Sequence, residues 1–490
     1  MAVQIAVHAH FYQPPRDNPW TKEIDPQPSA APFHDWNERV HAEAYKPNAF
    51  ARIPGEDEER VVNNFERLSF NVGPTLLAWM EGADPQTYAK IVAADARSRS
   101  RLGHGNAIAQ AFHHTILPLS SVRDVRTQVR WGVEDFRHRF GREPAGMWLP
   151  ETAANDDTLG VLIEEGIGFT ILAPGQASEW RELGGDWRRA EDEPIDPRVA
   201  YRYEHRDGSG RSLTLFFYDG GISHAIAFGD AGSSAEKFVD LFTQRAAEGI
   251  GLVHAATDGE TYGHHHVFTD LGLAYALFVE AEQRGIEVTN YAAYLEKEPP
   301  VREARIGPGD GSSWSCAHGV ERWRADCGCH TGGEAGWNQA WRGPLRDALE
   351  IVRSAADQAF ERLGTGLFAD PWAARDDYVH AVIGAAEADE IVGRNAGGPL
   401  DDAGRTRGRA LLELQESSMS MFTSCGWFFN DVGGIETVQV LRYAARTLEL
   451  LDSLGQPSPQ DAFVSMLEQA KSNDPDTGTG ADVFRALERA

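Results

Sequence analysis

The sequence predicts an α/β protein, in which a parallel β-sheet, open or closed into a barrel, is followed by an α-helical domain. Through residues 1–300, short apolar runs alternate with amphipathic helical patterns, an order typical of βα units and a parallel sheet. From Pro344 the pattern turns helical, with apolar residues at three- and four-residue spacing after Leu345 and again after Ile435. Functional residues in such a sheet are expected at the carboxyl ends of the strands.

Seven apolar runs are the predicted strands, at 3–9, 69–72, 107–109, 146–149, 169–172, 213–218 and 251–257. Helical patterns lie between them, for example at 122–139 and 156–165. Each of these two is followed by a glycine, which favours the end of a helix. Two longer segments interrupt the alternation. We expect 18–60 to be an ordered insertion near the active face and 174–211 to be a second excursion, because long segments in a compact domain are usually functional.

The 490 residues exceed one ordinary hydrophobic core, so several domains are expected. We predict a catalytic domain over 1–300 and a Gly/Trp/Cys-rich loop lining the cleft over 301–343. A helical domain follows over 344–470, and a linker with a short terminal helix over 471–490. The sequence leaves open whether a further domain follows, and it does not set the oligomeric state.

Composition narrows the range of partners. The formal net charge of −28 argues against nucleic acid or an anionic membrane surface, whereas a neutral carbohydrate would not be repelled. No apolar run approaches the ~20 residues that a membrane span needs. The N-terminal stretch reads as a buried strand without the layout of a signal peptide, and only four cysteines are present, so we expect a reducing, cytoplasmic location.

Two carboxylates carry the main chemical prediction. Glu151 follows the strand at 146–149 within Gly-Met-Trp-Leu-Pro-Glu, and Asp258 follows the strand at 251–257 within Asp-Gly-Glu-Thr-Tyr-Gly-His-His. Two carboxyl groups at the ends of different strands suit retaining glycoside chemistry, in which one attacks the anomeric carbon and the other transfers protons. The alternative interpretations are a carboxylate at a helix N-terminus for Glu151 and an acidic turn for Asp258.

Polar and aromatic side chains near these motifs are candidates for substrate binding. His8 and His10 alternate along the first strand, so both side chains share one face. They could bind a metal, but we favour hydrogen bonds to sugar hydroxyls and orientation of a carboxylate. Aromatic faces suit pyranose rings, although most of the 13 tryptophans are expected to pack ordinarily. The full set of binding candidates is His8, His10, Gln13, His114, Trp148, Glu260, His265, Trp314, Trp323 and Trp427.

A cysteine- and histidine-rich stretch lies within 301–343. Cys316-Ala-His318 and Cys327-Gly-Cys329-His330 have one-residue gaps, shorter than those of regular zinc modules, and Cys425 could complete a set. Two interpretations stay open. Cys316, Cys327 and Cys329 are candidate ligands of a structural metal, or they are reduced cysteines packed in a loop. We expect no catalytic metal and no cofactor.

These motifs together resemble glycoside hydrolase family 57, which contains α-amylases, 4-α-glucanotransferases and branching enzymes. The first family motif is similar to His8, His10, Gln13 and Pro14, with Phe11-Tyr12 inserted before the glutamine. The second resembles the stretch 112–117, in which Thr115 replaces a proline. The third and fourth are the specific ones, and they place the family nucleophile at Glu151 and its acid/base at Asp258. A loose fifth motif lies between Trp314 and Trp323.

The resemblance covers roughly residues 1–450. It implies an incomplete TIM-like (β/α)7 barrel followed by a helical domain, and retention of configuration on α-glucans without a required metal. The Cys/Trp-rich loop indicates a poorly characterised subgroup, so hydrolysis or transfer, linkage and chain length stay open. Two alternatives remain: a metal-dependent carbohydrate deacetylase using His8, His10 and Asp258, and a glucan-binding protein without catalysis.

Overall fold

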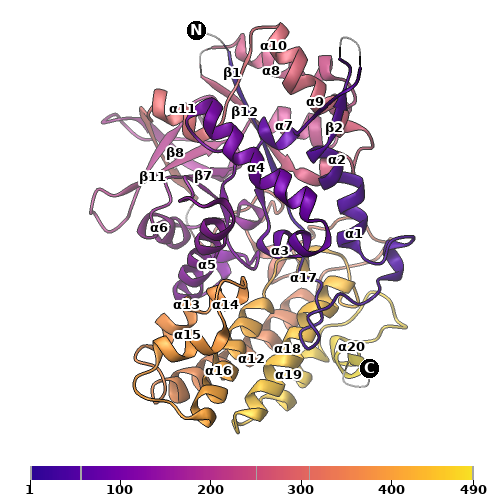
Figure 1. The fold of residues 1–490 in the computed structure, drawn as a ribbon, viewed down its shortest axis with the longest axis vertical. Coiled ribbons are helices and arrows are strands. Elements are labelled where there is room, and N and C mark those ends of the chain that lie inside the picture. The colour runs from indigo at the N-terminus through magenta and orange to yellow at the C-terminus, as the bar shows by residue number, and fades with distance from the viewer. Residues whose placement is uncertain (1–2, 56–57, 250, 308, 488–490) are drawn as a thin grey trace. The chain divides into compact units, whose positions relative to one another are not determined.

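The structure is a computed structural model that describes residues 3–55, 58–249, 251–307 and 309–487 (Figure 1). The chain divides into two compact units. The first unit comprises Met1–Gln13, Pro26–Gln110 and Arg139–Trp314. The second comprises Pro14–Asp25, Ala111–His138 and Ser315–Ala490. The segments 14–25 and 111–138, predicted as part of the first domain, thus group with the C-terminal helices.

All seven predicted strands form in the first unit, each end within two residues of its expected place. They are β1 (Gln4–Phe11), β4 (Ser69–Val72), β5 (Ala109–Gln110), β6 (Met147–Trp148), β7 (Phe169–Leu172), β11 (Ser212–Phe217) and β12 (Leu252–Asp258). β1 pairs in parallel with β12 and β4, β5 with β6, and β7 with β11. Single parallel bridges join Phe70 to Ala107 and Gly146 to Phe169. The strands therefore succeed one another in chain order, which is an α/β arrangement.

Burial on both faces explains why these strands read as continuous apolar runs. In β1 every residue after Gln4 is buried, and Ala6 joins Ile171, Phe216 and Leu252 in one core cluster. Helices connect the strands: α3 (Pro74–Ala83), α4 (Pro85–Leu102), α5 (Val122–Phe140), α6 (Asp156–Glu164), α7 (Gly220–Ala227), α8 (Ala235–Ala246), α9 (Thr269–Tyr275), α10 (Ala281–Gln283) and α11 (Tyr291–Lys297). The short β13 (Glu287–Val288) pairs with the start of β1.

A sheet extension that the sequence did not predict continues from β11. β10 (Tyr201–Glu204), β14 (Arg302–Ile306), β8 (Ala177–Glu182) and β9 (Arg188–Arg189) follow it in that order. Part of this sheet occupies the predicted excursion at 174–211, and β14 lies within the predicted loop at 301–343. These strands are rich in charge, and the buried Glu303 binds Arg202 at 2.7 Å and also Arg181. Sequence patterns based on apolar runs miss strands whose alternate positions form ion pairs.

The insertion at 18–60 is ordered in its described part and largely helical. It contains α1 (Trp36–Val40), a π-helical turn at His41–Tyr45, α2 (Lys46–Ala49) and the start of a hairpin formed by β2 (Ala51–Ile53) and β3 (Arg60–Val62). Asp35 caps α1 by accepting a hydrogen bond from the backbone of Glu38 at 3.0 Å. Tyr45 from this insertion donates a hydrogen bond to Glu260 of the Asp258 motif.

The second unit is helical, as predicted. Its helices are α12 (Arg342–Gly364), α13 (Pro371–Asp377), α14 (Val379–Val382), α15 (Ala388–Asn395), α16 (Asp402–Ser420), α17 (Cys425–Phe428), α18 (Ile435–Ser453), α19 (Gln460–Leu467) and α20 (Gly480–Leu487). Leu414, Leu450 and Leu451 pack with Ala356 in its core. The predicted linker before α20 is tied to the unit, because Ser472 and Asn473 both bind Asp431. The end of the predicted terminal helix, 488–490, lies outside the described residues.

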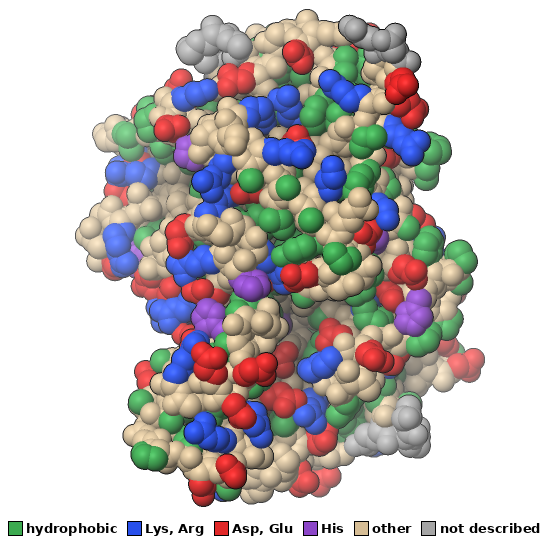
Figure 2. All heavy atoms as spheres, viewed as in Figure 1, with side chains coloured by type: hydrophobic (Ala, Val, Ile, Leu, Met, Phe, Trp, Pro, Cys, Tyr) green, Lys and Arg blue, Asp and Glu red, His purple; other side chains and the backbone are tan. Residues whose placement is uncertain are grey.

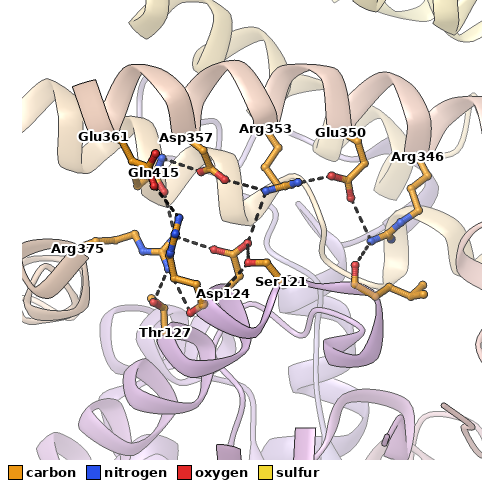
Figure 3. Close-up of polar contacts among 12 residues, drawn as sticks. Ser121, Asp124, Thr127, Arg346, Glu350, Arg353, Asp357, Glu361, Arg375 and Gln415 are labelled. Atoms are coloured by element: carbon orange, nitrogen blue, oxygen red, sulfur yellow. Dashed lines mark hydrogen bonds and ion pairs between the residues drawn. The ribbon is translucent and has the colours of Figure 1, made fainter. Parts of the chain in front are cut away.

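A polar network joins α5 to the C-terminal helices within the second unit (Figure 3). The buried guanidinium of Arg375 donates to Asp124 at 2.7 Å, to Thr127 at 2.7 Å and to Gln415 at 3.0 Å. Arg353 on α12 binds Asp357 at 2.8 Å and lies 4.0 Å from Asp124. These bonds explain why the segment 111–138 belongs with the C-terminal helices.

No described helix is long and apolar enough to cross a membrane. The face drawn in Figure 2 shows acidic and basic side chains interspersed.

Candidate active site

Glu151 lies in a strained turn directly after β6. Its φ is 56° and that of Thr152 is 50°, the left-handed region that non-glycine residues seldom adopt. Such strain is found mainly where a functional geometry requires it. Thr152 secures the turn, because its backbone N–H donates to Leu149 at 2.8 Å and its hydroxyl donates to Gln176 at 2.9 Å.

Trp314 holds Glu151 through two hydrogen bonds. The indole Nε1 donates to Oε2 of Glu151 at 3.0 Å, and the backbone N–H of Trp314 donates to the Glu151 carbonyl at 3.1 Å. The neighbouring pair Ala154 and Ser312 exchanges backbone hydrogen bonds. A residue 163 positions away in sequence therefore fixes the orientation of this buried carboxyl group.

A stack of rings lies beside Glu151. The ring of Trp148 stacks on His8 at 4.7 Å and on His10 at 5.2 Å, and meets Trp314 edge-on at 5.1 Å. Trp148 is completely buried, so it supports the histidines and cannot offer a free face to a ligand. This corrects its predicted role in substrate stacking. Trp314 is only half-buried and keeps that role open.

The two histidines of β1 share one partner. Asn71 on β4 accepts from or donates to both rings, with Oδ1 at 3.0 Å from His8 Nε2 and Nδ2 at 2.8 Å from His10 Nδ1. His8 Nδ1 also lies 3.1 Å from the Ser69 hydroxyl. Burial lowers the pKa of each histidine to about 3, so both are neutral at pH 7. Both nitrogens of His8 are thus engaged by the protein, which makes His8 a positioning residue.

Asp258 ends β12 directly beside His10, its register partner on β1. Asp258 is exposed at the surface of its unit, but many protein atoms lie around its carboxyl group and partly desolvate it. This desolvation, followed by the negative charge of Glu151, raises the pKa of Asp258 to about 7. The negative charge of Glu151, which follows β6, thus favours the protonated form of Asp258 at the end of β12.

Glu260 is the third carboxyl group of this region, and it is buried. It accepts hydrogen bonds from the Tyr12 backbone at 3.0 Å and from the Tyr45 hydroxyl. Burial and the charge of Asp258 raise its pKa to about 8. At neutral pH Glu260 is therefore largely protonated.

The remaining predicted residues fall into two groups. Gln13 is buried, His265 is exposed at the end of the Asp258 motif, and both belong to the first unit. The second unit contains the other three: His114, Trp323 and Trp427, all buried. Trp323 donates to the Ser424 carbonyl and Trp427 to the Arg342 carbonyl, each at 3.2 Å. Buried rings with satisfied indoles are core residues, which corrects the prediction that these two tryptophans stack on a sugar.

The structure also brings in residues that sequence reasoning missed. Asn71 joins the two histidines, Tyr45 binds Glu260, and Tyr218 meets Trp314 edge-on at 6.3 Å. Asn71 could have been found, because it lies in the strand at 69–72 on the partner of β1. Tyr45 had no signal, because it lies in the helical insertion.

A separate group of possible metal ligands lies in the second unit. Among the described residues, one set of side chains has ligand atoms close enough for a metal: Cys316, His318, Cys327 and Cys329. His8, His10 and Asp258, the ligands of the deacetylase alternative, do not form such a set within the described chain.

Solved structures of similar fold extend over nearly the whole chain. An exo-type maltose-forming amylase from Pyrococcus sp. ST04 has a TM-score of 0.68 at 16% identity, covering 95% of this chain and 83% of that one. A family 57-type branching enzyme from Pyrococcus horikoshii has a TM-score of 0.55 at 14% identity, covering 99% and 96%. A 4-α-glucanotransferase from Thermococcus litoralis has a TM-score of 0.54 at 15% identity, covering 92% and 60%. At these identities the similarity establishes the fold.

The sequence itself matches two described families. No curated protein matches the chain. Residues 337–489 match a domain of unknown function, DUF3536, which corresponds to most of the helical second unit. Residues 43–306 match glycosyl hydrolase family 57, and because this match spans more than half of the 490 residues, the protein belongs to that family.

Proposed function

We propose that this protein is a retaining glycoside hydrolase or transglycosylase that acts on α-glucans. Family membership supports the reaction class, and the similar folds of an amylase, a glucanotransferase and a branching enzyme support the substrate class. We further infer that the first unit is a (β/α)7 barrel, an incomplete TIM barrel. The hydrogen bond from the Asp219 N–H to the His254 carbonyl at 2.9 Å supports closure between β11 and β12.

One observation carries the assignment of roles: the two carboxyl groups have opposed environments. Asp258 has a pKa of about 7, raised by its protein surroundings and by Glu151, so a proton is available near neutral pH. Glu151 accepts a hydrogen bond from Trp314, which stabilises the carboxylate anion. Paired carboxyl groups with divergent protonation are the pattern of glycoside-cleaving sites.

The chemistry then proceeds in two displacements. The Glu151 carboxylate attacks the anomeric carbon while Asp258 protonates the departing glycosidic oxygen, giving a glycosyl-enzyme. In the second step the Asp258 carboxylate removes a proton from water or from a sugar hydroxyl, which attacks the same carbon and releases Glu151. Water gives hydrolysis and a sugar hydroxyl gives transfer. We predict a carboxyl–carboxyl separation of about 5–7 Å, near the retaining range.

The surrounding side chains act on this pair. His10 is neutral and lies beside Asp258 in register, so it can offer hydrogen bonds to a sugar hydroxyl without adding charge. Trp314 orients Glu151 and presents part of its ring. Asn71 and Trp148 hold His10 in place, and His8 contacts both of them.

The deacetylase alternative loses its support, because both ring nitrogens of His8 are bonded to Ser69 and Asn71. The non-catalytic alternative predicts glucan binding without turnover. Incubation with maltoheptaose, with products sized by mass spectrometry, separates these possibilities. Wild type should yield shorter oligomers, accompanied by longer ones if it transfers, while Glu151→Ala and Asp258→Ala yield none. Glu191→Gln, an exposed carboxyl group of the same unit, should behave as wild type.

Azide added to the two inactive variants assigns the roles individually. With a substrate whose leaving group needs no protonation, Asp258→Ala still forms the glycosyl-enzyme, and azide then captures it as the α-glycosyl azide. In Glu151→Ala azide takes the place of the carboxylate and gives the β-glycosyl azide. The reverse pattern would exchange the two roles, and intact substrate in every sample, including wild type, would contradict the proposed activity.

A further inference from the structure

Four potential metal ligands converge in the second unit, in the segment 315–343 that the proposed function leaves without a role. Cys316, His318, Cys327 and Cys329 each direct one ligand atom to a common point, and these four atoms all lie within 4.8 Å of one another. Cys425 and His330, which the sequence also offered, are not in this set. His330 instead binds the Gly332 carbonyl at 2.9 Å.

The distances between ligand atoms match a tetrahedral zinc site. Cys316 Sγ lies 3.9 Å from Cys327 Sγ and 3.8 Å from Cys329 Sγ, and Cys329 Sγ lies 3.6 Å from His318 Nδ1. Zinc bonds of about 2.3 Å to sulfur and about 2.0–2.1 Å to nitrogen, at tetrahedral angles, place two sulfurs roughly 3.8 Å apart and sulfur and nitrogen roughly 3.6 Å apart. The side chains therefore already outline the coordination shell of this ion.

Neither alternative explanation accounts for the cluster. A disulfide brings two sulfurs to about 2.05 Å and leaves the third cysteine and the histidine unexplained. Apolar packing of reduced cysteines requires burial, but Cys327 and Cys329 are only half-buried and His318 is exposed. The convergence of three thiols and an imidazole nitrogen at the protein surface calls for a shared partner.

The short spacing has a local cause. Each half of the set places two ligands two residues apart, closer than in regular zinc modules. Gly328, between Cys327 and Cys329, has a φ of 81°, a left-handed conformation that glycine adopts without strain. Both flanking thiols approach Cys316 Sγ across this bend. A glycine at this position therefore allows two cysteines separated by one residue to reach the same point.

The charge around the cluster fits an anionic centre. Arg342 is completely buried, and its guanidinium donates to the carbonyls of Cys329 at 2.8 Å and of Phe429 at 3.2 Å. Arg322 is also buried and donates to the Ser315 carbonyl at 2.9 Å. One divalent ion with three thiolates and a neutral imidazole has a net charge of −1, which offsets part of this buried positive charge.

We propose that Cys316, His318, Cys327 and Cys329 bind a Zn²⁺ ion in a structural site. The soft sulfur donors with one imidazole select zinc over hard cations such as Mg²⁺ or Ca²⁺. Four protein ligands complete a tetrahedron and leave no position for water or substrate, so the ion does not take part in bond cleavage. The proposal does not depend on the activity assigned above.

The ion supplies order where regular structure is sparse. Between 315 and 341 the described residues form one short helical turn, Glu321–Trp323, so backbone hydrogen bonds alone hold little of this segment. Linking residues 316, 318, 327 and 329 to one ion closes three short loops and couples folding of the segment to metal binding. In the sequence this segment begins directly after Trp314, the residue that orients Glu151.

Metal analysis of the full chain, expressed with zinc and freed of loosely bound ions, tests the proposal. We expect stoichiometric zinc in wild type and a loss of at least tenfold in Cys329→Ser and in Cys316→Ser. Cys425→Ser makes the same substitution at a cysteine outside the cluster and should retain the full zinc content. Replacing zinc by Co²⁺ in wild type should produce the charge-transfer and intense visible bands of tetrahedral cobalt bound to thiolates.

Thiol reactivity of the wild type keeps the test decisive if the serine variants fail to fold. In the native protein Cys316, Cys327 and Cys329 should resist alkylation until a chelator strips the ion, whereas the reactivity of Cys425 should be the same before and after. Absence of zinc together with absence of the cobalt bands would overturn the proposal. So would a chelator-independent reaction of all three thiols, or a mass two daltons low, which indicates a disulfide.

Discussion

Trp314 donates two hydrogen bonds to Glu151, one to its side chain and one to its backbone. The indole N–H donates to the carboxylate at 3.0 Å, and the backbone N–H donates to the carbonyl at 3.1 Å. The left-handed turn at Glu151 therefore has an external support that fixes the position of the carboxylate. Because the backbone bond survives any side-chain substitution, the indole bond can be removed by itself.

Trp314→Phe should lower kcat/KM without unfolding the protein. A hydrogen bond to a charged group contributes about 1.5–3 kcal/mol, which corresponds to roughly 10–100-fold in rate if the bond is used in the transition state. Steady-state kinetics on a maltooligosaccharide measures the loss. Trp187→Phe is the matched control, because Trp187 is also half-buried in the first unit but packs against Arg305 at 4.0 Å. Equal losses in both variants would remove the special role of Trp314.

The pH dependence should follow Asp258. Its pKa is raised to about 7 by its surroundings and by Glu151, and a general acid must be protonated to act, so kcat/KM should fall as pH rises through about 7. Glu151→Gln removes the neighbouring negative charge and should lower the pKa of Asp258, as followed by carbon NMR of the labelled carboxyl group. An unchanged titration in Glu151→Gln would show that the two groups do not interact.

The sequence was sufficient to predict the seven parallel strands of the first unit, because these strands are buried on both faces and therefore appear as apolar runs. It also identified Glu151 and Asp258 as candidates, since short motifs place each directly after such a run. It could not predict which tryptophans remain accessible: Trp314 and Trp427 have comparable neighbourhoods in sequence, but only the former is partly exposed.

The sheet extension and the grouping of α5 were missed for a related physical reason. β14 and β10 are stabilised by ion pairs at Glu303, and α5 is joined to the C-terminal helices by Arg375 and Asp124. Such pairs join residues more than a hundred positions apart, so no periodic pattern in the sequence predicts them. The cysteine cluster was visible in sequence, but the choice of His318 over His330 and Cys425 required coordinates.

Glu260 should make stability fall as pH rises. Its pKa is raised to about 8 from 4.5, first by burial and then by Asp258. Between these values the folded protein keeps a proton that the unfolded chain releases, so the free energy of unfolding decreases with increasing pH. Glu260→Gln keeps an oxygen for Tyr12 and Tyr45 but cannot ionise. Thermal unfolding at pH 5 and pH 8 should show a smaller decrease in this variant than in wild type, and Glu191→Gln should match wild type.

Arg375 should be a major source of stability in the second unit. Arg375→Met removes the closer of the two arginines that Asp124 pairs with in this largely buried setting and leaves only Arg353, at 4.0 Å; loss of one partner of a buried pair costs on the order of 3 kcal/mol. Denaturant unfolding measures the change. Arg409→Met breaks the exposed pair with Asp389 in the same unit and should cost at most about 0.5 kcal/mol. Similar losses in both variants would show that the network in Figure 3 adds little.

Gly263 in the Asp258 motif should not tolerate a side chain. Its φ is 124°, and an added Cβ would lie 2.3 Å from the Glu43 carbonyl oxygen of the insertion, so the backbone itself would have to move. Gly263→Ala should therefore destabilise the protein by more than about 1 kcal/mol and lower activity by displacing Tyr45, which lies two residues after Glu43 and binds Glu260. Gly82→Ala is the control, because Gly82 lies in α3 and an added Cβ there would meet no atom within 4 Å, so alanine should be neutral or stabilising. If Gly263→Ala retained wild-type stability and kinetics, the insertion would not fix the Asp258 motif in place.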